Sequence, residues 1–218
     1  MQLQDAIRDY LATQLCKISD LYKWNFTLTG FPDNNYEQTG LNAYEKSRNL
    51  RSMINNEINN RSPISNDLQI WYVKNWGGVK SNKNETMLTY MNANVDQLIS
   101  LGSKGIATWS KILSIRNPSE YAIYDARVAV SLNSIQKIYD VESPILFPQL
   151  TSRNKSFVLP TQQIINNSRF FKNKCDMNFY LKYLDILSYA TSKTNGFDIQ
   201  DAEMVLFSNA EELSTTWR

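Results

Sequence analysis

The residue with the clearest chemical potential in this sequence is Asp125, which precedes apolar residues at helical spacing, Val128, Leu132 and Ile135. This spacing predicts that Asp125 is the N-cap of a helix, where backbone N–H groups keep a carboxylate charged and fix its direction. Such a carboxylate can stabilise the positive charge that develops on a sugar when a glycosidic bond breaks, and can orient a water molecule. Taken alone, an aspartate at this position is more often a simple cap, worth roughly 1 kcal/mol.

The 218 residues include no histidine, which is the usual general base near neutral pH and a very common ligand of transition metals. This excludes Ser-His-Asp hydrolases, Cys-His proteases, HNH-type nucleases and enzymes with His-ligated zinc. The two cysteines, Cys16 and Cys175, belong to no ligand-spaced set, which predicts a reduced cytoplasmic location and neither metal nor cofactor. Any chemistry must rest on carboxylates, Lys, Tyr, Ser, Thr or Cys.

A glycine-containing turn lies upstream of Asp125. Gly102 and Gly105 let backbone amides approach a partner closely, and a helix beginning near Ile106 would point its free N–H groups outward, as a phosphate site requires. The same glycines could simply end one helix and begin another. Between the turn and Asp125, residues 117–120 (Asn-Pro-Ser-Glu) predict a capped helix start with proline at its first position.

Two further patterns surround these features. Residues 110–113 read Ser-Lys-Ile-Leu, residues 124–129 read Tyr-Asp-Ala-Arg-Val-Ala, and residues 180–210 read as a closing pair of helices. With the Leu-x-x-x-Gly turn at residues 101–105, these patterns resemble the helix-hairpin-helix superfamily of DNA glycosylases, and most closely the 8-oxoguanine DNA glycosylase fold group. The resemblance covers about half of the chain and leaves the first hundred residues largely unmatched.

The resemblance implies an all-α, two-lobed fold with an active-site cleft between the lobes, formed by a single domain over residues 1–218. The hairpin would span about 95–116, the catalytic helix would begin at 125, and the closing helices would span about 176–213. The implied activity is hydrolysis of the N-glycosidic bond of a damaged or modified base flipped out of double-stranded DNA, which leaves an abasic site. Small bacterial members of the group also suggest antiphage defence against hypermodified bases such as glucosylated hydroxymethylcytosine.

The resemblance also assigns roles to individual residues. Asp125 would be catalytic, and the DNA-binding residues would be Gly102, Ser103, Gly105, Ile106, Lys80 and Arg127. A flipped base needs aromatic walls, for which the candidates are Trp71, Tyr72, Trp76 and Trp109, although each alone is more often a core residue.

Two alignments of the hairpin are possible, and they differ in the lysine chemistry. Without gaps, the position of a Schiff-base lysine in bifunctional relatives falls on Ala107, which favours a monofunctional enzyme. In a shifted register Lys104 takes that position and Lys111 supports it, which leaves an imine step open.

The rest of the sequence indicates helices joined by short connections. Glycine and proline are scarce, 7 and 6 residues, and 42% of the chain is hydrophobic. Helices are expected over residues 3–22, 42–59, 67–76, 84–101, 176–193 and 199–213, with a proline-marked loop over 143–160. No segment is apolar enough for a signal peptide or a membrane span, and we expect a soluble monomer.

The net charge of +2 is small, but basic residues gather in residues 74–116 and 153–174 while acidic residues gather near the C-terminus. This distribution favours one basic face that binds DNA. Two other interpretations stay open: a helix-hairpin-helix module that binds the DNA backbone without catalysis, and a helical scaffold protein whose basic segments are ordinary solvated surface.

Overall fold

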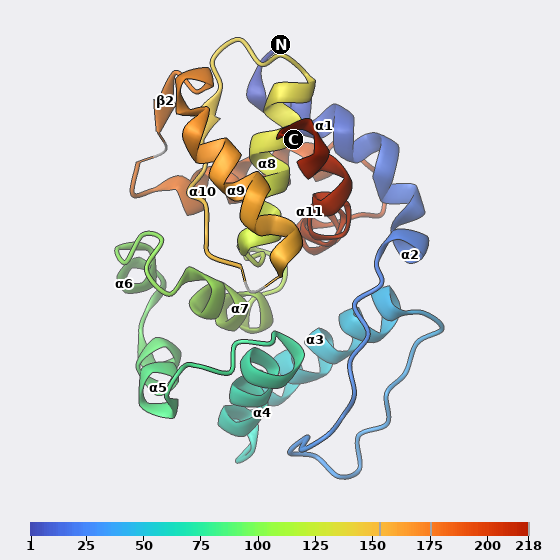
Figure 1. The fold of residues 1–218 in the computed structure, drawn as a ribbon. Coiled ribbons are helices and arrows are strands. Elements are labelled where there is room, and N and C mark those ends of the chain that lie inside the picture. Colours follow the sequence, from blue (N-terminus) through green and yellow to red (C-terminus); the bar gives the residue numbers. More distant parts are fainter. Residues whose placement is uncertain (153, 175, 218) are drawn as a thin grey trace.

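Helices make up nearly all of the regular structure in a computed structural model that describes residues 1–152, 154–174 and 176–217 (Figure 1). This confirms the predicted all-α class. Arg153, from the second basic segment, and Cys175 lie outside the described residues. The α-helices are α1 Leu3–Gln14, α2 Ile18–Leu21, α3 Ala43–Asn59, α4 Ser65–Trp71, α5 Asn84–Asn92, α6 Val95–Ile99, α7 Ile106–Arg116, α8 Ala126–Ile138, α9 Val158–Asn166, α10 Phe179–Thr191 and α11 Ile199–Ser214.

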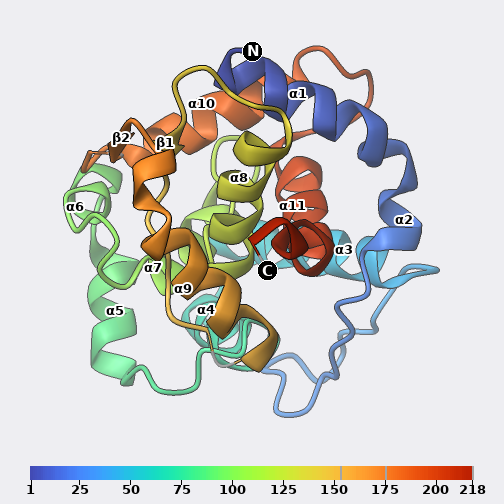
Figure 2. The same cartoon turned by 45° about the horizontal axis from the view of Figure 1, so that its top comes forward.

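Helix α8 lies at the centre of the molecule, with α9 and α11 on either side of it (Figure 2). Residues Val128 to Gln136 of this helix are all buried, so its polar side chains must find partners inside the protein. Asn133 exchanges two hydrogen bonds of 3.0 Å with the backbone of Phe147, and Gln136 exchanges bonds of 2.9 and 2.8 Å with the backbone of Ile145. These side-chain amides hold the segment after α8 against the helix.

The segment that α8 holds contains β1, Ile145–Leu146, which pairs in parallel with β2, Asn173–Lys174. The sequence predicted a loop over residues 143–160, but α9 begins at Val158. Pro160 lies in the first turn of α9, where the N–H that proline lacks has no helical acceptor to bind. Proline therefore marks the start of a helix here.

The apolar side chains form a main core between α1, α8, α10 and α11 and a second core between α3, α4 and the segment that follows α4. In Figure 1 the first group of helices lies above the second. Helix α7 joins them, because Trp109 packs in the main core while Ile115 packs in the second. The predicted division into two lobes with a cleft between them stays a prediction.

Three predicted elements differ in detail. The helix expected over 3–22 is interrupted by a 3₁₀ turn, Leu15–Lys17, and the helix expected over 67–76 continues from α4 into a π-helical turn, Tyr72–Trp76. The helix expected over 84–101 is two helices, because Asn94 forms a capping box with Gln97 and starts α6.

The predicted helix start at residues 117–120 is wrong. The amides of Glu120 and Tyr121 both donate to the Asn117 carbonyl and form a turn, after which the chain runs extended to Asp125. The other long helices lie close to their predicted bounds. None of the helices in the described ranges has both the length and the apolar character needed to cross a lipid bilayer.

Candidate active site

Asp125 is the N-cap residue of α8, as its spacing predicted. One carboxylate oxygen, Oδ1, accepts hydrogen bonds from the amides of Arg127 at 2.9 Å and Val128 at 3.0 Å. The second oxygen accepts none from another described residue, and the side chain is half-buried. One oxygen therefore fixes the carboxylate to the helix end, and the other is free to meet a ligand.

The extended segment before Asp125 is held by two tyrosines of α10. The Tyr180 hydroxyl donates to the Ala122 carbonyl at 2.8 Å, and the Tyr183 hydroxyl donates to the Ile123 carbonyl at 2.9 Å. Both tyrosines are buried in the main core. Helix α10 therefore fixes the backbone that delivers Asp125 to its place.

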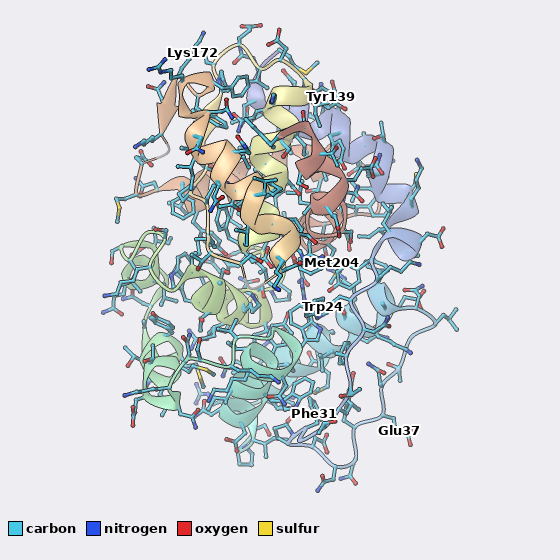
Figure 3. All side chains as sticks on the ribbon, in the orientation of Figure 1. Trp24, Phe31, Glu37, Tyr139, Lys172 and Met204 are labelled. Carbon is cyan, nitrogen blue, oxygen red and sulfur yellow. The ribbon has the colours of Figure 1, made fainter. Side chains whose placement is uncertain are left out.

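Asp125 lines two adjoining cavities. The outer one is a groove of about 530 Å³, and the inner one is smaller, about 40 Å³. The groove falls within the volume range of ligand sites, whereas the inner cavity has room for roughly three water molecules. Five residues line both: Trp24, Gly77, Lys111, Asp125 and Phe207. Figure 3 shows Trp24 at the level where the two groups of helices meet.

Lys111 lines the same two cavities as Asp125. It is 4% exposed, and its Nζ donates to the Ala107 carbonyl at 2.9 Å. Burial lowers the pKa of this ammonium group, while the negative charges of Asp125 and Glu203 act in the opposite direction. Among the described residues no ion pair joins Lys111 to a carboxylate, so its remaining N–H bonds are available to a ligand.

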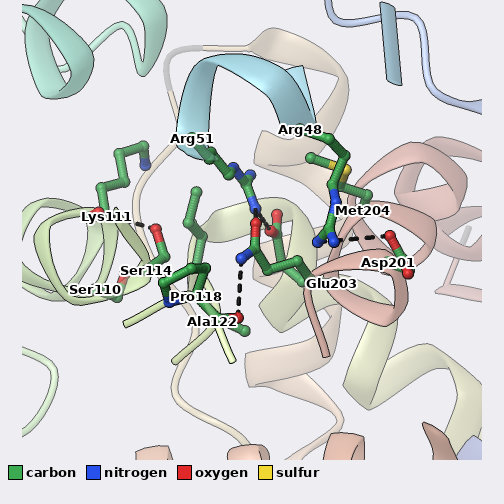
Figure 4. Close-up of polar contacts among 12 residues, drawn as sticks. Arg48, Arg51, Ser110, Lys111, Ser114, Pro118, Ala122, Asp201, Glu203 and Met204 are labelled. Carbon is green, nitrogen blue, oxygen red and sulfur yellow. Dashed lines mark hydrogen bonds and ion pairs between the residues drawn. The ribbon is translucent and has the colours of Figure 1, made fainter. Parts of the chain in front are cut away.

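Glu203 of α11 lines the inner cavity and is 2% exposed. Arg51 of α3 is 1% exposed and pairs with Glu203, with a distance of 2.8 Å between Arg51 Nη1 and Glu203 Oε2 (Figure 4). Burial raises the pKa of the Glu203 carboxyl, and the facing Arg51 charge opposes that rise. Arg51 also lies 5.1 Å from the centre of the Trp76 ring, which is another wall of the inner cavity.

The predicted hairpin is formed by α6, a turn and α7. Gly102 and Gly105 have φ values of 56° and 70°, a left-handed conformation that favours glycine. The close approaches that these glycines allow are internal: added side chains would meet Met177 and Tyr90, respectively. The amides of Ser103 and Gly105 donate no hydrogen bond to another described residue, so the turn retains free donors.

The predicted aromatic walls separate into two pairs. Trp76 lines the inner cavity, and Tyr72 stacks on it with ring centres 4.4 Å apart. Trp71 and Trp109 lie in the two cores and line neither Asp125 cavity. Their indole N–H groups donate to the carbonyls of Thr29 and Lys104, both at 3.0 Å.

The predicted basic residues also separate. Lys104 is exposed in the hairpin turn and lines neither Asp125 cavity. Of the two candidate lysines, only Lys111 shares these cavities with Asp125. Arg127 lines the groove, where its guanidinium carbon lies 5.2 Å from the Phe157 ring centre and 4.6 Å from that of Phe207. Lys80 is exposed and lines a neighbouring cavity of about 450 Å³ that Trp24 and Trp76 also line.

Three important residues of the site were missed from the sequence: Trp24, Glu203 and Phe207. Trp24 lies in an irregular segment without periodicity, and its indole N–H donates to the Trp76 carbonyl at 3.0 Å. Glu203 and Phe207 are four residues apart, so they lie on one face of α11. A carboxylate in an otherwise apolar helical stripe was the available signal for Glu203.

Comparison of the chain with protein-family models, with curated proteins and with solved structures gives no significant match. The geometry of this site is therefore the basis on which a function can be proposed.

Proposed function

We propose that the protein is a DNA N-glycosylase that acts on a damaged or modified base flipped out of double-stranded DNA. The observation that carries this proposal is the free carboxylate oxygen of Asp125, which is fixed to the head of α8 and open to a groove of about 530 Å³. A flipped nucleotide would enter this groove, with its base between aromatic side chains and its sugar beside Asp125.

The reaction would need no metal and no histidine. The C1′–N bond breaks, its electron pair leaves with the base, and a proton from solvent neutralises the base. The Asp125 carboxylate stabilises the positive charge on the sugar and orients the water whose oxygen forms the new bond to C1′. The water gives up one proton to Asp125 or to solvent, and the products are a free base and an abasic site.

Lys111 would add positive charge close to the departing base. Excision by water is the default proposal, and Lys111 is better placed than Lys104 for an imine step, because it shares both cavities with Asp125. Borohydride reduction during the reaction tests that step. A covalent protein–DNA adduct that disappears in Lys111→Met would assign the imine to Lys111.

The hairpin would hold the DNA backbone through the free amides of Ser103 and Gly105 and through Arg127 in the groove wall. These same features support the second candidate function, a module that binds DNA without catalysis. Within the glycosylase proposal, the family resemblance favours a monomeric cytoplasmic enzyme and hypermodified phage bases, such as glucosylated hydroxymethylcytosine, as substrates.

The test is release of bases from a panel of cellular and phage DNAs, measured by mass spectrometry, with alkali cleavage to detect abasic sites. Asp125→Asn should abolish release while it preserves DNA affinity. Asp198→Asn is the control, because Asp198 also accepts hydrogen bonds from two amides at the head of its helix but pairs with Arg48 and lines neither Asp125 cavity. If no DNA in the panel loses a base, or if Asp125→Asn is fully active, the catalytic proposal is rejected.

A further inference from the structure

The inner cavity has a carboxylate in its wall that the proposed reaction does not use. Glu203 is 2% exposed, and Arg51 contacts its Oε2 at 2.8 Å. Its other oxygen, Oε1, accepts no hydrogen bond from a residue in the described ranges. A buried ion pair gives little or no net stability over a well-packed apolar pair. Stability therefore does not explain why α11 places a carboxylate at this cavity.

The aromatic side chains around Glu203 form a narrow cavity that could accept the edge of a flat ring. The inner cavity is also lined by Tyr22, Trp24, Trp76 and Phe207. Trp24 and Phe207 meet edge to face, with ring centres 5.5 Å apart. The cavity of about 40 Å³ holds a few waters and opens beside Asp125, so a ring seated in the groove would reach it with one edge.

We propose that Glu203, held by Arg51, is the specificity-determining residue of the site and selects bases that present an exocyclic amino group, as cytosine and adenine do. This inference rests on the proposed function, because it assumes that a flipped base enters the groove. Oε1 accepts the amino N–H, as carboxylates accept from the cytosine amine in the major groove. A carbonyl at the same position would face the carboxylate oxygen and leave both acceptors unpaired.

Arg51 determines which atom of the side chain at position 203 faces the cavity. Its Nη1 also donates to Gln200 Oε1 at 3.1 Å, so the guanidinium is fixed independently of any ligand. In Glu203→Gln the amide oxygen would stay on Arg51, since Arg51 offers only N–H donors. The amide NH₂ would then face the cavity. The substitution replaces a cavity-facing acceptor with a donor at almost constant volume.

The experiment measures binding and needs no cleavage. Duplexes carry 2′-fluoro-2′-deoxycytidine, its 2-pyrimidinone analogue without the amino group, or 2′-fluoro-2′-deoxyuridine, each opposite an abasic-site analogue that lowers the cost of base flipping. The wild-type protein should bind the cytosine duplex at least about tenfold more tightly than the other two. Glu203→Gln should lose this preference or shift it towards uracil, whereas Glu211→Gln, an exposed position on the same helix, should keep it.

Equal affinity of the wild-type protein for the three duplexes overturns the inference, and so does an unchanged preference in a folded Glu203→Gln variant. The wild-type comparison stands even if Glu203→Gln fails to fold. Asp125→Asn should keep the preference for cytosine. Base release without this preference rejects the role of Glu203 and retains the glycosylase, whereas the preference without base release rejects catalysis and retains the recognition site.

Discussion

Gly77 lies directly against the side chain of Lys111. A Cβ atom added at Gly77 would come within 2.6 Å of Lys111 Cε and 2.7 Å of its Cδ. The φ value of Gly77 is −81°, which is not restricted to glycine, but the added Cβ would also come within 2.8 Å of the Val73 carbonyl oxygen. Glycine is needed here for space, and this space allows the π-helical turn to pass over the buried lysine beside Asp125.

We therefore expect Gly77→Ala to displace Lys111 and to destabilise the protein by about 1–3 kcal/mol, the usual cost of overpacking. Base release should fall together with stability. Urea unfolding of Gly77→Ala, Lys111→Ala and the double variant measures the coupling between the two positions. The alanine at 77 should cost less when Lys111 is already shortened, and strictly additive losses would contradict the contact.

The stability of the protein should depend on pH through Lys111. Burial lowers the pKa of this group in the folded protein, while the unfolded chain titrates near the usual value of about 10.4. Between these two values the unfolded chain binds a proton that the folded protein does not, so the free energy of unfolding rises with pH in this window. This contribution to stability is complete above about pH 10.4 and is lost as the pH falls through the window to the lowered pKa of the folded protein.

This dependence is measured by urea unfolding from pH 7 to 10 in the wild type and in Lys111→Met. The stability of the wild type relative to the variant should increase with pH. Lys104→Met is the control, because it removes an exposed lysine from the same hairpin. A constant difference between wild type and Lys111→Met across this range would contradict the effect of burial.

Substitutions of Asp125 should distinguish its role as a helix cap from its role in catalysis. Asparagine and aspartate are comparable N-caps, so Asp125→Asn should change the free energy of unfolding by less than about 1 kcal/mol, and Asp125→Ala should cost about 1 kcal/mol. Both variants should reduce base release by at least about a hundredfold, because neither provides a negative charge beside the sugar. Loss of activity in proportion to stability alone would reduce Asp125 to a cap.

Arg127 should contribute to DNA affinity through its charge. Its guanidinium is held between Phe157 and Phe207 in the groove wall, and no described carboxylate forms an ion pair with it. Arg127→Gln should weaken binding to all sequences and reduce the slope of log K against log salt by about 0.9. Arg8→Gln should leave the slope unchanged, because Arg8 pairs with Asp5 at 2.6 Å on α1.

Removing one partner of the Arg51–Glu203 ion pair should destabilise the protein strongly, whereas replacing both partners with apolar residues should destabilise it little. Arg51→Met alone leaves a buried carboxylate without its partner and should cost about 3–5 kcal/mol. The double variant Arg51→Met, Glu203→Leu should recover most of that loss. Thermal and urea unfolding of the single and double variants measure the recovery, and a double variant as unstable as Arg51→Met would show that packing controls this position.

Local patterns predicted the elements that carry the site. The apolar spacing after Asp125 placed the start of α8 correctly, and the glycines at 102 and 105 marked the hairpin turn. The predictions were less accurate at prolines, which occur both in turns and at the start of helices. Pro118 lies in a turn where a helix start was expected, while Pro160 lies in the first turn of a helix where a loop was expected, because proline favours both settings.

The sequence by itself determined the helical class, the exclusion of histidine chemistry and the position of a carboxylate at a helix start. These follow from composition and from contacts between residues close in the chain. The tertiary structure decided which side chains face that carboxylate: it buried Lys111, left Lys104 exposed, and brought Trp24 and Glu203 to the same cavity. Apolar periodicity shows which face of a helix is buried, but it does not show which other helix face that side meets, because this depends on packing between residues far apart in the chain.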